Sequence, residues 1–381
     1  MTLRLSSVKT ALGAAAALAC TLASPAYPQA SAPATAQSMP CQPEVDGLRF
    51  ICGVSNPEDL VPVPGTKWLI ASGYNPGGGL PAGQGLHLID TSAKTASPLY
   101  RESGGRSRGR CGGAPPPDLE THGLYLDTES GAGQYTLYAV SHAPRESVEL
   151  FSVTASANAV SLVWKDCFLL PQGMRGNGVA VLGDKSILVT VLNAPGRAAA
   201  GGASRGVVLM KRLNAADFQP IAGTELPGDN GIEVSKDKKE FFVVGFGDAT
   251  VYVFSSDNPQ APLRYAKAPG FVPDNLRWSG DQLIGTGPVY DEPACGGTRR
   301  EAALVLGEAG RKPGGGCNRG YVAAALDPEK MTWKILAYAE PNPQIGIISA
   351  GVVTGDTLWI GAALSPGLAY RALPRPPQQP R

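Results

Sequence analysis

The chain has 381 residues, enough for one large domain or two ordinary ones with a substantial buried core. Lys and Arg number 33 against 32 Asp and Glu, so the formal net charge of +1 provides no overall field that would recruit nucleic acid or an anionic membrane. The 48 Gly and 34 Pro, with only 17% charged residues, are typical of many short strands joined by many turns.

Residues 1–26 are predicted to form a secretory signal peptide. Arg4 and Lys9 precede the apolar run "ALGAAAALACTLA", and a small-x-small cleavage site ends at Ala26. Cys20 leaves a lipoprotein open as an alternative, although Ala17 stands where a lipobox has Leu. No other segment approaches the roughly 20 apolar residues of a membrane span. We therefore expect an exported protein, periplasmic or secreted, without a membrane span.

Six cysteines remain after the signal peptide. An even number in an exported chain favours disulfides over metal-binding or catalytic thiols, although six cysteines allow 15 connectivities. Proximity in the sequence suggests three pairs, which are Cys41 with Cys52, Cys295 with Cys317, and Cys111 with Cys167.

The pattern between residues 41 and 372 is all-β, and it repeats. Residues 27–40 form a Pro/Ala-rich linker, and the Pro-rich tail 373–381 is expected to be disordered. In the repeating region a small or polar turn opens each of six units, and alternating apolar segments follow. The units start near Glu58, His122, Asn177, Asn230, Asn275 and Ser349, 45 to 74 residues apart. About four strands per unit predict a six-bladed β-propeller, with a β-sandwich as the structural alternative.

Five oxygen-bearing side chains stand at or just before the first strand of their units. They are Glu58, Asn177, Asn230, Asp274 and Asn275. A propeller gathers the first strands of its blades around a central channel, so these side chains can converge although they are far apart in sequence. Burying them without partners would cost about 1 to 3 kcal/mol each, and Ca²⁺ accepts six to eight such oxygens. The pattern predicts a calcium site, with turn capping by Asp and Asn as the rival interpretation.

Two of the three histidines lie in one unit. His122 begins its first strand and His142 ends the next one, so antiparallel pairing could place both imidazoles at one end of the channel. Two unrelated histidines are the plainer alternative. His87 is interpreted as an ordinary strand residue.

The segments "HGLYL", "HAPRESVELF", "NGVAV", "NGIEVSKDKKEFFVV" and "VPDNLRW" resemble the paraoxonase/arylesterase family. Its members are six-bladed, calcium-dependent propellers, related to the gluconolactonase-like superfamily, that hydrolyse lactones and aryl esters. The resemblance implies that the five oxygen-bearing residues bind a catalytic calcium and that His122 and His142 form the family's histidine dyad. The family's second, structural calcium would take Asp59 and the Leu124 carbonyl. Gly178 stands where the family has a third ligand, an Asp, so the resemblance leaves this second ion open.

The resulting hypothesis is a calcium-dependent hydrolase of lactones or aryl esters. Calcium would polarise the substrate carbonyl, and His122, oriented by His142, would take a proton from the attacking water. Glu58 is a rival base. Two alternatives remain: a gluconolactonase-like or strictosidine-synthase-like propeller enzyme, which would not require the histidine pair, and a non-enzymatic binding module with structural calcium. The sequence indicates neither the natural substrate nor the oligomeric state.

Overall fold

Strands are the only regular secondary structure in the part of the computed structural model that is described, which comprises residues 40–76, 83, 85–100, 111–196, 205–290 and 319–373. These residues all belong to one unit, Thr35–Arg381. The predicted signal peptide, nearly all of the linker and tail, and the predicted Cys295–Cys317 bond lie outside the described residues. Within them, no helix has the length and apolar character needed to cross a membrane.

The strands form six sheets. The first sheet holds β3 (Leu60–Pro62), β4 (Trp68–Ala71), β5 (His87–Asp90) and β6 (Thr95–Pro98). The second holds β7 (Glu120–Asp127), β8 (Gln134–Ala143), β9 (Ser147–Ala155) and β10 (Val160–Leu169). The third holds β11 (Gly176–Val181), β12 (Ile187–Val191), β13 (Val207–Lys211) and β14 (Gln219–Pro220). The fourth holds β15 (Asp229–Val234), β16 (Glu240–Gly245), β17 (Thr250–Ser255) and β18 (Arg264–Lys267). The fifth holds β19 (Leu276–Ser279), β20 (Gln282–Pro288), β21 (Tyr321–Asp327) and β22 (Thr332–Ala339). The sixth holds β23 (Gly346–Thr354), β24 (Thr357–Leu364) and β25 (Gly367–Ala372), followed by β2 (Leu48–Cys52) and β1 (Glu44–Val45).

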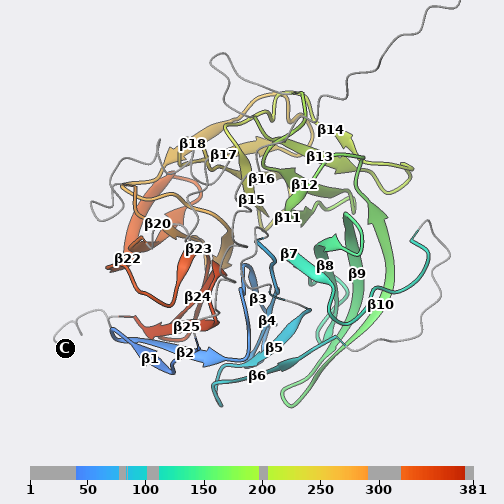
Figure 1. The fold of residues 1–381 in the computed structure, drawn as a ribbon. Helices are drawn as coiled ribbons and strands as arrows, with labels where there is room; N and C mark the ends of the chain where they lie inside the picture. The colour runs from blue at the N-terminus through green and yellow to red at the C-terminus, as the bar shows by residue number, and fades with distance from the viewer. Residues whose placement is uncertain are drawn as a thin grey trace, which may run out of the picture. The chain divides into compact units, whose positions relative to one another are not determined.

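Each of the first five sheets is an antiparallel meander whose strands follow one another along the chain. The sheets surround a centre, and β3, β7, β11, β15 and β23 lie nearest to it (Figure 1). The predicted all-β class and six-bladed β-propeller are confirmed, because every predicted unit start lies in, or within two residues of, the first strand of a sheet.

Burial decreases from the centre outward. All residues of β11 and of β15 are buried, whereas most residues of β22 are partly or fully exposed. One buried cluster joins Val140 of the second sheet, Val189 of the third and Val243 of the fourth, so the core lies between the faces of neighbouring sheets.

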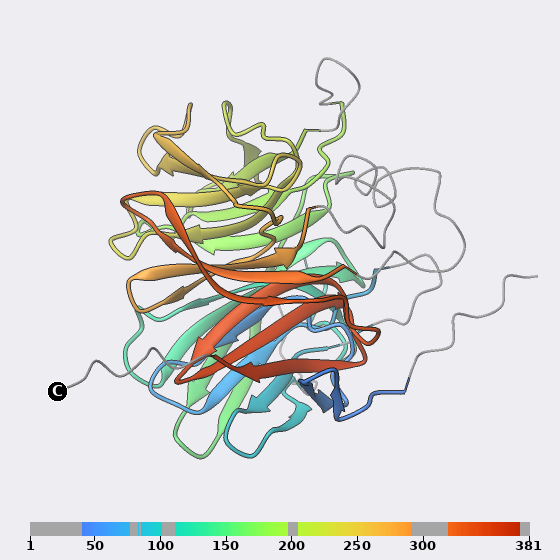
Figure 2. The ribbon, with the colours of Figure 1, turned by 90° about the vertical axis from the view of Figure 1, so that its left-hand side faces the viewer.

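The two ends of the chain complete the sixth sheet. β2 pairs antiparallel with β25, which sets Phe50 opposite Ala369 and Cys52 opposite Gly367. The blue N-terminal strands accordingly lie beside the red C-terminal strands (Figures 1 and 2). The predicted units do not include β2, because a five-residue pattern gives no sign that its partner lies at the far end of the chain.

Two disulfide bonds lie within the described residues. Cys41 is bonded to Cys52 and Cys111 to Cys167, which confirms two of the predicted pairs. Both bonds are compatible with an exported protein.

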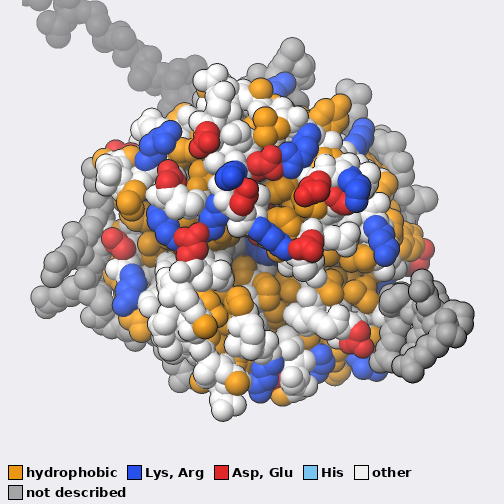
Figure 3. Space-filling model, turned by 180° about the vertical axis from the view of Figure 1, so that it is seen from behind, with side chains coloured by type: hydrophobic (Ala, Val, Ile, Leu, Met, Phe, Trp, Pro, Cys, Tyr) orange, Lys and Arg blue, Asp and Glu red, His pale blue; other side chains and the backbone are white. Residues whose placement is uncertain are grey.

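Charged side chains of both signs are interspersed on the face shown in Figure 3, with no broad area of one sign among the atoms described there. This distribution agrees with the balanced formal charge of the chain.

Candidate functional site

The first strands of neighbouring sheets lie close enough at the centre that glycine is needed there. Gly123, Gly178 and Gly231 each follow one of the predicted site residues in the dipeptides "HG", "NG" and "NG". A Cβ on Gly123 would overlap the carbonyl oxygen of Asn177 on the next first strand, and a Cβ on Gly231 would overlap that of Asp274. The repeated glycine after a polar residue is therefore a sequence signal for the central ring of strands.

Backbone and side-chain contacts complete this ring between the fifth, sixth and first sheets. Asn275 donates its backbone N–H to the Ser349 carbonyl at 2.8 Å, and the Ser349 hydroxyl donates to the Glu58 carbonyl at 2.6 Å. The Asn275 amide Nδ2 also donates to Glu58 Oε1 at 2.9 Å. Asn275 therefore holds the Glu58 carboxylate in place, although the two residues are 217 positions apart in the sequence.

Four of the five predicted ligands present a buried oxygen that has no hydrogen-bond partner among the described residues. These atoms are Glu58 Oε2, Asn177 Oδ1, Asn230 Oδ1 and Asp274 Oδ1. The four residues are at most 7% exposed. Each such buried oxygen costs about 1 to 3 kcal/mol unless something satisfies it, and carboxylate and amide oxygens are the ligands that Ca²⁺ prefers. The donor set fits a hard cation.

The charges of these side chains also favour a bound cation. Burial, together with the neighbouring Glu58 and Asp59 carboxylates, raises the pKa of Asp274 well above its usual range. A dication beside Glu58 and Asp274 would offset this repulsion. No group of three or more His, Cys, Asp or Glu suited to a metal occurs in the described part of the chain, so the candidate set is a mixed one of two carboxylates and amides.

The predicted second calcium site does not fit a metal, because a guanidinium is already there. Arg277, which is 5% exposed, donates Nη2 to Asp59 Oδ2 and, at 2.6 Å, to the Leu124 carbonyl. Its Nε donates to the Leu60 carbonyl at 2.9 Å. Gly178 supplies no carboxylate, and a Cβ there would lie 3.0 Å from Ile232 and 3.2 Å from the Asn230 carbonyl.

The two predicted dyad histidines do meet. Nδ1 of His122 lies 2.9 Å from Nε2 of His142, and the rings are inclined at 63°. Nε2 of His122 lies 3.6 Å from Glu58 Oε2, one of the unpartnered oxygens. Burial, followed by the charges of His122 and Arg175, lowers the pKa of His142 well below its usual value, so His142 is neutral at neutral pH.

Three further residues adjoin the dyad that the sequence did not single out. Glu146 lies 2.9 Å from His142 Nδ1, and Arg175 lies 3.4 Å from Glu146. The Tyr74 ring centre is 4.3 Å from that of His122. Glu146 belongs to the quoted segment "HAPRESVELF", but nothing in the sequence shows that the β8–β9 turn folds it back onto His142.

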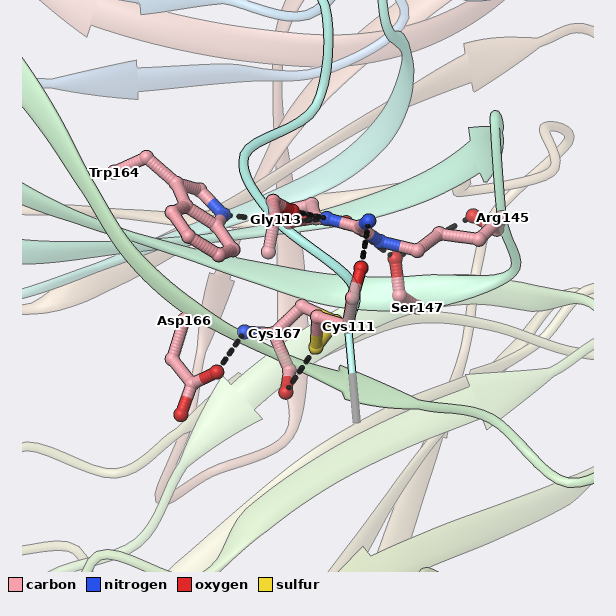
Figure 4. The surroundings of a disulfide bond; sticks show 8 residues. Cys111, Gly113, Arg145, Ser147, Trp164, Asp166 and Cys167 are labelled. Carbon is pink, nitrogen blue, oxygen red and sulfur yellow. Dashed lines mark hydrogen bonds and ion pairs between the residues drawn. A yellow bond between two sulfur atoms is a disulfide. The ribbon is translucent and has the colours of Figure 1, made fainter. Parts of the chain in front are cut away.

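Arg145, which precedes Glu146, anchors the turn between β8 and β9 (Figure 4). Arg145 donates Nη1 to the Cys111 carbonyl at 2.5 Å and Nη2 to the Gly113 carbonyl at 3.0 Å. It also forms a two-pronged ion pair with the fully buried Glu149, at 2.8 and 3.0 Å. The Cys111–Cys167 bond adjoins this network, so the segment around the dyad is fixed by covalent and ionic contacts.

No family model and no curated protein sequence matches the chain. Among solved structures, a gluconolactonase from Xanthomonas campestris is 15% identical, with a TM-score of 0.47 over 86% of this chain and 89% of that chain. A luciferin-regenerating enzyme is 11% identical, with a TM-score of 0.47 over 85% of this chain and 94% of that chain. A chain of a nidogen/laminin complex is 9% identical, with a TM-score of 0.41 over 74% of this chain and 79% of that chain. At these identities and scores the likenesses assign neither an activity nor a ligand to this chain.

Proposed function

We propose that the protein is a calcium-dependent hydrolase of carboxylic esters, with lactones and aryl esters as substrates, similar to the paraoxonase/arylesterase family. The observation that carries the proposal is a linked imidazole pair that lies 3.6 Å from Glu58 Oε2, which is one of four unpartnered buried oxygens of the predicted ligands. Neither feature alone indicates hydrolysis, but together they would supply a base next to a cation site.

The ion would be held by Glu58, Asn177, Asn230 and Asp274, with Asn275 holding Glu58. When bound, calcium supplies a Lewis acid that polarises the substrate carbonyl. We propose one ion per chain at this axis, since the Arg277 guanidinium already neutralises Asp59.

His122 is the proposed general base. Its Nε2 faces the unpartnered Glu58 Oε2, and its Nδ1 is tied to His142. A water between the imidazole and the substrate carbonyl would give its proton to His122 Nε2 as its oxygen bonds to the carbonyl carbon. Glu58 is less suited to this role, because one of its oxygens accepts from Asn275 and the other belongs to the cation site.

Hydrolysis assays with and without a chelator test the proposal. We expect turnover of aliphatic lactones, acyl-homoserine lactones or phenyl acetate that is lost on chelation and restored by Ca²⁺. Glucono-lactone as an additional substrate distinguishes the gluconolactonase-like alternative. Absence of hydrolysis of every substrate by the calcium-loaded protein would reject the proposal in favour of a binding module.

His122→Gln separates the base from the metal site. We expect the variant to lose about 10²-fold or more in kcat, in line with removal of a positioned proton acceptor, while the calcium-induced rise in Tm persists. A variant with full lactonase turnover would remove His122 from the mechanism and leave the cation site standing.

A further inference from the structure

Glu146 is joined to the proposed base through both imidazoles. Its Oε1 and Oε2 lie 2.9 and 3.0 Å from Nδ1 of His142, whose Nε2 lies 2.9 Å from Nδ1 of His122. The side chain of His142 is 1% exposed and that of Glu146 is 31% exposed. The three residues therefore form a continuous chain of hydrogen bonds from the buried axis to the surface.

The two ends of this chain determine where its protons lie. Above the pKa of about 7 that burial gives Glu146, its carboxylate is ionised and can only accept, so Nδ1 of His142 carries the proton and its Nε2 presents a lone pair. Nδ1 of His122 must then donate to that lone pair, which leaves the lone pair of His122 at Nε2. This is the ring nitrogen that faces Glu58 and the axis.

Resting on the proposed hydrolase function, we propose that Glu146 is a positioning residue that fixes the tautomers of both imidazoles and holds the proton released by the attacking water until the leaving oxygen takes it. Glu146 is the outer end of the chain. Its side chain is 31% exposed, against 9% for His122 and 1% for His142.

The proton count balances along this path. Water gives a proton to His122 Nε2, the Nδ1 proton of His122 moves to His142 Nε2, and the Nδ1 proton of His142 moves to Glu146. The water oxygen bonds to the carbonyl carbon, and the ring C–O bond breaks to give a hydroxy acid, whose carboxyl proton is lost to solvent at neutral pH. The leaving oxygen takes its proton from His122 Nε2 as the three shifts reverse, which returns the proton held by Glu146 and restores Nδ1–H on both imidazoles.

The groups facing Glu146 suit it to exchange this proton. Burial, opposed by the charge of Arg175, raises the pKa of Glu146 to about 7. Arg175 Nη1 lies 3.4 Å away, and Glu120 of β7, which pairs with Arg175 at 3.1 Å, adds negative charge. At the inner end, the Tyr74 ring lies tilted against that of His122, and Glu58 Oε2 is 3.6 Å from His122 Nε2.

Kinetics of Glu146→Gln test the proton path. Gln keeps the size of the side chain but cannot accept a proton, so we expect kcat to fall about 10²-fold with little change in KM. High concentrations of a small buffer such as imidazole should restore part of this loss, and Glu146→Asp should retain more activity than the Gln variant. Glu120→Gln is the matched control, because it removes a carboxylate from the other side of Arg175 without contacting a histidine.

Ring ¹⁵N NMR tests the tautomers independently of activity. The chain has only three histidines, so His87 serves as an internal reference and single His→Gln variants assign the signals. We expect protonated Nδ1 and unprotonated Nε2 at both His122 and His142 at mildly alkaline pH, and a mixture of tautomers in Glu146→Gln.

The outcomes separate this inference from the proposed function. If the parent protein hydrolyses nothing, the hydrolase proposal fails, but the ¹⁵N pattern still decides the tautomer assignment. Unprotonated Nδ1 at His122 in the parent overturns the inference. So does a Glu146→Gln variant with the parent's kcat and the parent's ring signals.

Discussion

Replacing Arg277 by Met removes a buried positive charge while keeping a side chain of similar length. Arg277 is 5% exposed and joins four sheets: it pairs with Asp59 of the first sheet and the Leu124 carbonyl of the second, and Nη1 lies 3.7 Å from Glu233 of the fourth. Its own backbone lies in β19 of the fifth. The Met variant would leave the Asp59 carboxylate, which is 1% exposed, without its cation.

The magnitude follows from that burial. Removing one partner of a buried ion pair costs about 3 to 5 kcal/mol, because the remaining charge is left uncompensated. A propeller of roughly 330 residues has an unfolding entropy of about 0.7 kcal/mol/K at Tm, so this loss corresponds to a fall in Tm of about 4 to 7 °C. The free energy of unfolding of an ordinary domain is about 5 to 15 kcal/mol, so the variant should still fold.

Denaturant unfolding monitored by circular dichroism, with calcium present, measures this loss. Arg264→Met is the matched control, because Arg264 forms a two-pronged pair with Glu240, at 2.7 and 2.7 Å, but both side chains are about 30% exposed. We expect the control to cost about 1 kcal/mol or less. Equal losses in the two variants, or no loss in Arg277→Met, would refute the view that the Arg277 guanidinium serves as an internal cation at this position.

Equilibrium dialysis against Ca²⁺ should give one tightly bound ion per chain; a stoichiometry of two would contradict the assignment of the Asp59 site to Arg277. Asp274→Asn removes a carboxylate whose pKa burial raises, so we expect a higher Tm than the parent without calcium, and a smaller rise in Tm on adding it. Burial also raises the pKa of Glu233 from 4.5 to about 7, so the folded state binds this proton more tightly than the unfolded state does. Stability of the calcium-free protein should therefore fall as the pH rises from 4.5 through about 7, and Glu233→Gln should reduce this dependence when Tm is measured across that range. Loss of the Cys111–Cys167 bond, which spans 56 residues, should destabilise by about 4 kcal/mol against about 3 for Cys41–Cys52, which spans 11, when the double Ala variants are compared by denaturant unfolding.

The first strand of each blade could be predicted from the sequence because its signal repeats. A polar residue followed by a buried, alternating segment recurs along the chain, and the geometry of a propeller brings every such residue to the axis. Asn177 and Asn230 lie where this pattern places them, and both leave an oxygen unpartnered. That they bind calcium remains a prediction.

Contacts that depend on the path of a side chain could not be predicted. Arg277 follows the quoted "DNL" directly, yet its partner Asp59 is 218 residues away and gives no local sign of needing a guanidinium. Glu146 reaches His142 because Arg145 and Glu149 fix the turn between β8 and β9, and no periodic pattern specifies such a turn. These residues act through long-range geometry, whereas sequence patterns report local structure.

The pairing of β2 with β25 makes the order of folding depend on the last residues of the chain. Ser365 donates its backbone N–H to the Asn56 side chain at 2.9 Å, across 309 residues, and contacts of such large sequence separation form slowly. Until the C-terminal strands arrive, β2 presents an unpaired edge, which is a site for association with other chains. Removing β25 should therefore open the ring and favour aggregation rather than produce a smaller propeller.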